Sequence, residues 1–299
     1  MNSTYILACV SEKPINDIFQ LELEKIISSN HLIIFSKEFK TTSLSHALFF
    51  DLELISTQKE ILNLDLTRLA SLHRIDIELI PKSLFETKKK LAIFDMDSTL
   101  ITSEVIDEMA IKHGIGDKVK IITSKAMNGE LNFDQSLRER VSLLKGFHRR
   151  HMEDILQGLN LTPGTKEFLK ILKRSGVKTA IASGGFKFFA KNIQSQLEMD
   201  YVFANDLEFD GDLLTGNVLG AIVNAEAKEN IVIDLAKREN LSLDQVVAIG
   251  DGANDIPMLL RAGLGIAIHA KEKVQKSANY RINFGPMTHA LSYMNHEII

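Results

Sequence analysis

Short apolar runs of strand length, separated by helical stretches, fill the sequence between residues 91 and 268. Each run is apolar on both faces, as in a parallel sheet that helices cover on both sides. This alternation constrains the fold more than any other feature and predicts a Rossmann-like α/β unit with a parallel sheet. The predicted strands lie at residues 91–97, 177–183, 201–205, 245–251 and 264–268.

A long helical segment interrupts the predicted sheet between its first and second strands. A crossover between parallel strands needs far less chain than this segment provides. We therefore expect an inserted helical cap at residues 103–160, which leaves 91–102 and 161–299 as the α/β core. The helical stretches of the cap lie at residues 103–114, 117–129, 133–146 and 149–159.

Residues 1–82 form a separate block with strand and helix signals in the order βαββαβ. This order is the split βαβ pattern of ferredoxin-like α+β modules. Residues 83–90 are predicted to be a linker, because a proline precedes them and three lysines end them. In the first block, strands are predicted at 4–10, 31–36, 46–55 and 74–80, and helices at 15–29 and 57–73.

Composition excludes several classes of protein. The net charge of −4 argues against bulk binding of nucleic acid. The single cysteine, Cys9, excludes an internal disulfide and fits a reducing compartment. No apolar stretch approaches the ~20 residues that span a bilayer, and the short apolar run near the start lacks the basic residues of a signal peptide. We expect a soluble, cytoplasmic protein without membrane contact.

Polar residues follow several of the predicted strands. Asp95 and Asp97 end the first strand, Ser183 ends the second, and Asp251 ends the fourth. Ligands of open α/β sheets bind outside the carboxyl ends of the strands. These side chains are therefore expected to meet at one edge of the sheet.

The pair Asp95 and Asp97 predicts phosphoryl chemistry. Alternation along a strand points both side chains to the same face, where their mutual repulsion calls for a hard divalent cation such as Mg²⁺. Asp251 would be a further ligand. One aspartate would attack phosphorus, and the other would serve as general acid and then base. Alternatively Asp97 only caps the following turn, but this explains neither Asp95 nor the acids at 251 and 255.

Lys228 occupies an unexpected position on a helix that Asn224 is predicted to cap. At about 100° per residue, it falls within the apolar stripe of Ile231, Val232 and Leu235. It also lies near the helix N-terminus, where the macrodipole disfavours a cation. The lysine either snorkels past the stripe or meets an anionic ligand beyond it, and we favour the ligand.

Ser183 and Gly184 suit a phosphate cradle at the end of the second strand. A hydroxyl and backbone N–H groups in front of a helix N-terminus form an anion site. Taken alone, this serine and its two following glycines are more typical of a turn. Their place at a strand end favours the anion site.

The cap offers candidates for recognising a substrate. Arg140 lies nearer than Arg138 to the buried side of its helix, where a guanidinium could bind a carboxylate. Either arginine could instead be a surface charge. Glu104 has close rivals in Asp107 and Glu108, and the residues themselves leave that choice open.

Four motifs together resemble those of the haloacid dehalogenase-like hydrolases. They are DMDST at 95–99, IASGG at 181–185, Lys228 within NAEAKENI, and GDGANDIPM at 250–258. The segments DMDSTLITSEVIDEMA and SLRERVSLLKG are similar to those of the phosphoserine phosphatase group of that family. The resemblance covers about residues 89–285 and implies the haloacid dehalogenase fold.

The resemblance implies Mg²⁺-dependent hydrolysis of O-phosphoserine, the last step of serine biosynthesis, through an aspartyl phosphate. It also resolves the choices left open above. It implies that Asp95 is the nucleophile and Asp97 the general acid and then base. The metal would be bound by Asp95, the Asp97 carbonyl and Asp251, with Asp255 nearby. The phosphate would be bound by Ser183, Gly184 and Lys228, and the rest of the substrate by Glu104, Arg140, Asn254 and the cap-closing Phe133.

The same resemblance implies an ACT-like module in residues 1–82, either regulatory or forming a homodimer. Two other functions compete with the phosphatase. A phosphoacceptor signalling module would need neither Asp97 as acid and base nor a large cap. A related phosphotransferase, or a phosphatase for another small phosphomonoester, is disfavoured but not excluded by Glu104 and Arg140.

Overall fold

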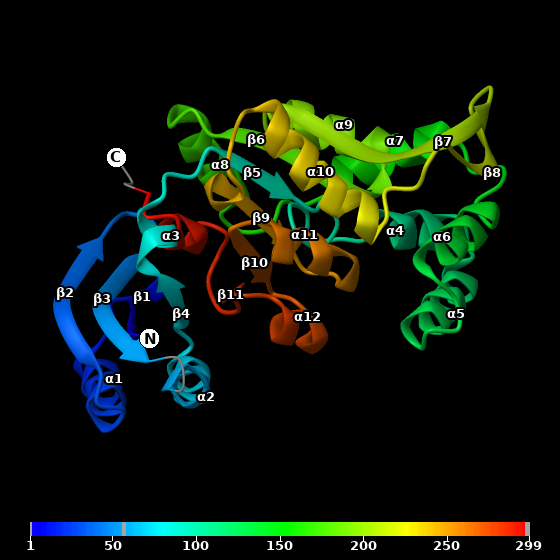
Figure 1. Ribbon diagram of the computed structural model, residues 1–299. Helices are drawn as coiled ribbons and strands as arrows, with labels where there is room; N and C mark the ends of the chain where they lie inside the picture. The colour runs from blue at the N-terminus through cyan, green and yellow to red at the C-terminus, as the bar shows by residue number, and fades with distance from the viewer. Residues whose placement is uncertain (1, 56–57, 297–299) are drawn as a thin grey trace.

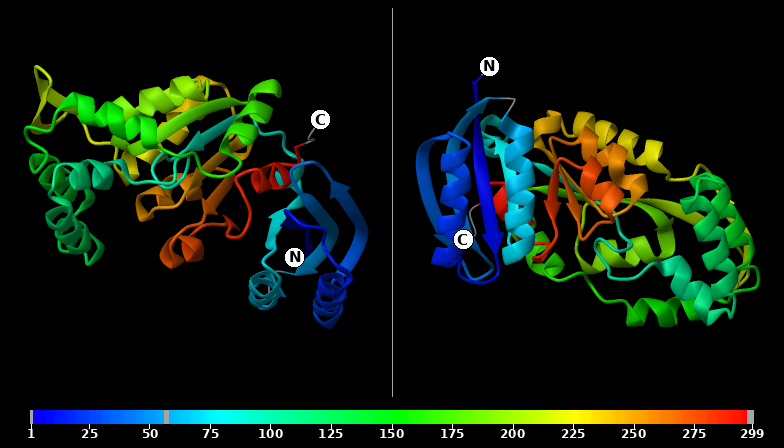
Figure 2. Two further views of the ribbon diagram at one scale, coloured as in Figure 1. Left: turned by 180° about the vertical axis from the view of Figure 1, so that it is seen from behind. Right: turned by 90° about the horizontal axis from the view of Figure 1, so that it is seen from below.

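The computed structural model describes residues 2–55 and 58–296, which form two β-sheets with helices packed on them. The predicted helix start at residue 57 lies outside the described residues. The larger sheet occupies the middle of the molecule, with the N-terminal sheet at one end and the cap helices at the other (Figure 1, Figure 2). No helix within the described ranges is both long and apolar enough to cross a membrane.

The N-terminal unit, residues 2–81, is an antiparallel sheet with the strand order β2-β3-β1-β4. Its buried side chains include Phe19, Leu23 and Leu66 of the two helices, packed on Leu7 and Phe50 of the strands. Its elements are β1 (Asn2–Ser11), α1 (Asp17–Ser29), β2 (Ile33–Thr41), β3 (His46–Ile55), α2 (Gln58–His73) and β4 (Asp76–Pro81).

The core sheet has the strand order β11-β10-β9-β5-β6-β7-β8. All neighbouring pairs are parallel except β7 with β8, which are antiparallel. The expectation of a purely parallel sheet was therefore wrong at this edge, where β8 alternates buried and exposed residues. The strands are β5 (Leu91–Phe94), β6 (Lys178–Phe186), β7 (Tyr201–Asp210), β8 (Leu213–Leu219), β9 (Val246–Gly250), β10 (Leu264–Ile268) and β11 (Tyr280–Ile282).

Helices cover both faces of the core sheet, which explains its continuous apolar strands. In β5, Leu91 and Ile93 pack with Val232 on one face, while Phe94 packs with Phe168 on the other. Burial of both faces is what makes these strands apolar at every position. The helices are α8 (Thr165–Arg174), α9 (Lys187–Gln196), α10 (Ala225–Arg238), α11 (Ile256–Arg261), α12 (Glu272–Ser277) and α13 (His289–Tyr293).

The segment predicted as a cap contains four helices beside the carboxyl ends of the core strands (Figure 1). Backbone hydrogen bonds fasten it to the β7–β8 hairpin, including Gly146 N–H to the Leu214 carbonyl at 2.7 Å and Arg149 N–H to the Asp212 carbonyl at 2.8 Å. The cap helices are α4 (Val105–Lys112), α5 (Gly116–Met127), α6 (Phe133–Ser142) and α7 (Arg149–Gly158).

The connection between the N-terminal unit and the core is structured. The predicted linker overlaps a short helix, α3 (Lys82–Glu86), whose Phe85 is buried. Lys89 is buried as well and donates to the carbonyls of Leu84 and Thr87, and burial lowers its pKa to about 8. The expectation of a plain linker missed these contacts, because one buried aromatic residue leaves little periodic signal.

Buried acids of β4 join the N-terminal unit to the core. Asp76 accepts hydrogen bonds from the backbone N–H groups of residues 283–285 and lies 2.7 Å from His289 Nδ1. Glu78 pairs with Arg281 at 2.8 Å. Each acid is below 5% exposed, so buried polar contacts join the two units.

Candidate active site

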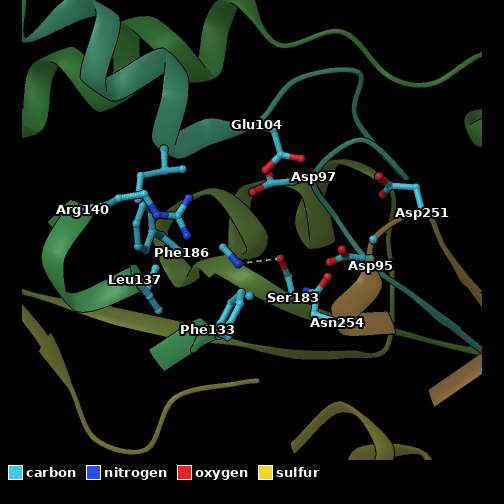
Figure 3. A pocket seen from close by; sticks show the side chains of 14 residues that line it. Asp95, Asp97, Glu104, Phe133, Leu137, Arg140, Ser183, Phe186, Asp251 and Asn254 are labelled. Atoms are coloured by element: carbon cyan, nitrogen blue, oxygen red, sulfur yellow. Dashed lines mark hydrogen bonds between the residues drawn. The ribbon is translucent and has the colours of Figure 1, made fainter. Parts of the chain in front are cut away.

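The strand order brings the predicted strand-end residues to one place. β5 lies between β9 and β6, so Asp95 has Asp251 on one side and Ser183 on the other. Figure 3 shows these side chains around a cavity, with Glu104 and Arg140 entering from the cap. The cavity has a volume of about 120 Å³ and is lined by Asp95, Asp97, Glu104, Ile106, Phe133, Leu137, Arg140, Ser183, Gly184, Gly185, Phe186, Asp251, Gly252 and Asn254.

Lys228 lies behind Asp95 and is fully buried, as the apolar stripe around it predicted. Its Nζ is 2.9 Å from Asp95 Oδ1 and 2.6 Å from Asp255 Oδ1. Burial opposes a charged lysine, but the two carboxylates outweigh burial and raise its pKa. The ammonium therefore stays charged and holds both acids in place. Asn224 accepts from the N–H of Ala227 and caps this helix, as predicted.

The negative charge of the acids around Lys228 exceeds the positive charge near them. Asp95, Asp251 and Asp255 bring carboxylate oxygens within 4.8 Å of one another. Burial, and then the charge of Asp95, raise the pKa of Asp251 to about 7 and that of Asp255 to about 7. With all three carboxylates ionised, one ammonium would leave two negative charges uncompensated, and the raised pKa values of Asp251 and Asp255 reflect this repulsion. Hard oxygen donors with this charge fit a divalent cation.

The three acids differ in how free their oxygens are. Asp255 accepts from Lys228 with one oxygen and from the N–H groups of Asp251 and Gly252 with the other. It therefore orients the loop after β9. Asp251 is held by the hydroxyl of Thr99 at 2.8 Å and lines the cavity, so Asp95 and Asp251 are the acids best placed to contact an ion.

Asp97 has an unsatisfied oxygen in a buried setting. Its Oδ1 is shielded from water and has no hydrogen-bond partner among the described residues. Burial, followed by the charges of Glu104 and Asp95, raises the pKa of Asp97 well above its usual range. A Cβ at Gly185 would lie 2.9 Å from Asp97 Oδ2, so only glycine lets this carboxyl group lie against the end of β6. The arrangement favours a protonated Asp97 that can donate to a ligand.

The end of β6, with Ser183, offers donors to an anion. Ser183 is fully buried, and its Oγ accepts from the N–H of Gly185 at 2.9 Å, the dashed line in Figure 3. Its hydroxyl hydrogen remains available to a ligand. The cap closes tightly here, because a Cβ on Gly184 would lie 2.7 Å from the ring of Phe133.

Glu104 and Arg140 carry opposite charges on the cap side of the cavity. Glu104 is exposed to solvent. Desolvation by the surrounding residues nonetheless raises its pKa, and the hydrogen bond from Ser98 opposes this shift. Burial lowers the pKa of Arg140, and Asp107 and Glu104 oppose that shift. The Nε of Arg140 donates to the Ser136 carbonyl at 3.3 Å, which leaves the end of the guanidinium free to point into the cavity (Figure 3).

Sequence reasoning missed the residues that hold others in place. The Ser98 hydroxyl donates to Glu104 at 2.9 Å, and Ser98 itself has a φ of 55°. Asn205 is 1% exposed; its amide donates to the Gly184 carbonyl and accepts from Val223 N–H, both at 2.8 Å. Ser98 lies within the DMDST motif and Asn205 ends the predicted strand 201–205, so both had a local signal, but only the structure shows what they hold. Also missed were the lining residues Ile106, Leu137, Phe186 and Gly252.

Comparison with known proteins gives the relatives of the chain. The phosphoserine phosphatase of Archaeoglobus fulgidus is 46% identical over 209 residues, which are 70% of this chain and 61% of that protein. The chain thus spans less than two thirds of that relative. The phosphoserine phosphatase of Saccharomyces cerevisiae is 37% identical over 305 residues, 99% of this chain and 98% of that enzyme.

Solved structures and sequence profiles agree with these relatives. The crystal structure of a HAD family hydrolase from Salmonella enterica serovar Typhi matches with a TM-score of 0.86 and 31% identity, over 98% of this chain and 100% of that one. The sequence profile of haloacid dehalogenase-like hydrolases matches residues 89–263, which include every residue that lines the cavity. The chain therefore belongs to the haloacid dehalogenase-like hydrolase family.

Proposed function

We propose that this chain is a phosphoserine phosphatase that hydrolyses O-phosphoserine to serine and phosphate, the last step of serine biosynthesis. One observation carries the proposal. A single small cavity holds the strand-end acids Asp95 and Asp97 on one side and the charged pair Glu104 and Arg140 on the other. Such a cavity can take a phosphoryl group at one end and an amino acid at the other. The names of the yeast and archaeal relatives support this assignment.

In the proposed reaction, Asp95 attacks phosphorus and becomes an aspartyl phosphate while the serine oxygen leaves. Asp97, whose raised pKa favours the protonated form, gives its proton to that oxygen. The carboxylate so formed then takes a proton from the water that attacks the aspartyl phosphate. Ser183, Gly184 and Lys228 would bind the phosphoryl oxygens and stabilise the charge that develops on them.

We infer that Mg²⁺ is the metal, held by Asp95, Asp251 and the main-chain carbonyl of Asp97, with Asp255 supporting the site. The excess of two negative charges and the purely oxygen donor set support Mg²⁺ over softer ions. When bound, the ion would polarise the phosphoryl group and offset the repulsion between it and the acids.

We propose that the cap reads the amino-acid part of the substrate. Glu104 would bind the ammonium group, and Arg140 would bind the carboxylate. Asn254 would contact the substrate nearby, and Phe133 would close over it. The opposite charges of Glu104 and Arg140 support this order, because each matches one charged group of the amino acid.

Phosphate release from three substrates tests the proposal. 3-Phosphoglycerate has a hydroxyl in place of the ammonium of O-phosphoserine, and phosphoethanolamine lacks the carboxylate. We expect the highest kcat/KM with O-phosphoserine. Arg140→Ala should lower kcat/KM for O-phosphoserine by roughly 10- to 100-fold, as expected for a charged hydrogen bond, and leave phosphoethanolamine almost unchanged. The control is Arg138→Ala, at an exposed position of the same helix. Equal losses on both substrates would overturn the role of Arg140, and no activity on O-phosphoserine would overturn the proposal.

The remaining assignments are also proposals. We infer that residues 1–82 are an ACT-like module of ferredoxin-like topology, which its element order and strand order support, and that a homodimer forms through it. We place the linker at 83–90, the cap at 103–160, and the catalytic core at 91–102 and 161–299. The cytoplasm is the proposed compartment, since the buried thiol of Cys9 fits reducing conditions.

A further inference from the structure

A polar contact joins the cap to the helix that carries Lys228. Asp134 lies in the first turn of α6, and Asn224 is the N-cap of α10. The side-chain amide of Asn224 donates to both oxygens of the Asp134 carboxylate, at 3.1 and 3.4 Å. The two residues are 90 positions apart in the chain, so the packing of the cap on the core brings them together.

Asn224 uses both ends of its amide. Its Oδ1 accepts from the N–H of Ala227 at 3.0 Å and so caps α10, while its Nδ2 donates to Asp134. Only this orientation of the amide satisfies both partners, because a carboxylate accepts and an N–H donates. The first turn of α10, which ends at Lys228, is therefore tied to the cap through one side chain.

The contact lies beside the mouth of the cavity. Asp134 follows Phe133, whose ring lies against Gly184 at the end of β6. The far end of α6 is fixed differently, through the backbone bonds of residues 146–149 to the β7–β8 hairpin. The start of α6 thus meets the core through side chains, Phe133 on Gly184 and Asp134 on Asn224, whereas the chain after α6 is held by backbone bonds.

We propose that Asp134 and Asn224 form the latch of the cap, a pair of positioning residues that holds Phe133 over Gly184. Neither residue lines the cavity, and both act through Phe133 and the first turn of α10. The latch keeps the first turn of α10, and with it Lys228, in register with the closed cap. Its kinetic consequence rests on the proposed phosphatase function, whereas its structural consequence does not.

Exchanging the two side chains tests the latch. Asn224→Asp keeps the helix cap, because aspartate caps as well as asparagine, but it sets two carboxylates against each other. The double variant D134N/N224D restores one donor and one acceptor in reversed places. We expect N224D to raise KM for O-phosphoserine about tenfold, the size of one lost charged hydrogen bond, and the double variant to recover most of that loss.

Hydrogen–deuterium exchange of the free protein provides a readout that does not need activity. N224D should increase exchange in residues 133–142, and the double variant should return it toward wild type. D134A, which leaves the cap of α10 intact, should loosen the same segment and carries the test if N224D does not fold. The control is D117N, which changes an exposed acid in the first turn of α5.

Wild-type exchange in residues 133–142 of N224D and D134A would overturn the latch, as would a double variant no better than N224D. A wild-type protein that does not hydrolyse O-phosphoserine would overturn the proposed function instead. In that case the exchange measurements still test whether Asp134 and Asn224 hold the cap in place. The two proposals therefore fail separately.

Discussion

Replacing Lys228 with methionine tests the electrostatic balance of the site. The side chain keeps its length but loses the ammonium that lies 2.9 Å from Asp95 and 2.6 Å from Asp255. Lys228 is fully buried, so water cannot replace it without disturbing the packing. Three acids of the site, with Asp251 as the third, would remain without a cation.

The expected cost is large for a single substitution. Breaking a buried ion pair by removing one partner costs about 3–5 kcal/mol, against a total free energy of unfolding of about 5–15 kcal/mol for a typical domain. Protonation of the acids limits this cost. Asp251 and Asp255 have pKa values of about 7, above the ordinary 3.8, so a moderate fall in pH neutralises both.

The sign of the pH dependence follows from these values. Ionising an acid whose pKa is raised in the folded state opposes folding, so the free energy of unfolding falls as pH rises from about 4 to about 7. Without Lys228 the pKa values rise further, and the loss extends to higher pH. The difference between wild type and Lys228→Met should therefore be small near pH 5 and approach its full size near pH 8.

Urea unfolding at pH 5 and pH 8, with and without Mg²⁺, measures this difference. Mg²⁺ should return part of the lost stability at pH 8, because it supplies positive charge to the same acids. The control is Lys237→Met, at an exposed position of the same helix, which should change little. A loss below about 1 kcal/mol at pH 8, typical of a surface pair, or an equal loss at both pH values would refute the reasoning.

Three further predictions concern other contacts. Asp95→Asn should abolish turnover and the trapping of an acid-stable phosphoenzyme; normal phosphate release would contradict its role as nucleophile. Ser98→Ala removes the hydrogen bond to Glu104 and should raise KM for O-phosphoserine about threefold to tenfold. KM for 3-phosphoglycerate should not change, and an equal rise there would contradict the role of Ser98. Asp76→Ala leaves three backbone N–H groups and His289 without their acceptor, so it should lower the free energy of unfolding by about 2–4 kcal/mol; an unchanged urea midpoint would show that the N-terminal unit is held by other contacts.

Several features of the site were predictable because they depend on the local sequence. Asp95 and Asp97 directly follow an apolar run, and alternation along a strand places both side chains on one face. Lys228 interrupts an apolar stripe at helical spacing, which predicts its burial without a structure. The order of strands and helices gave the α/β core and the inserted helices for the same reason, since periodicity records which face of each element is buried.

Other features depend on segments that the sequence separates widely. The free Oδ1 of Asp97, the amide of Asn205 on the Gly184 carbonyl and the contact of Asp134 with Asn224 each need tertiary packing. The antiparallel strand β8 was missed because its alternation of buried and exposed residues is short.

The sequence by itself determined which residue types end the strands and which helix face carries Lys228. Only the tertiary structure decided how the Arg140 guanidinium is held at the cavity, which side chains orient Glu104 and Asp251, and that Asp97 has a buried oxygen without a partner among the described residues. The physical reason is that periodicity encodes the burial of a residue within its own element. The direction and the hydrogen-bond partner of a side chain depend on what other elements bring against it.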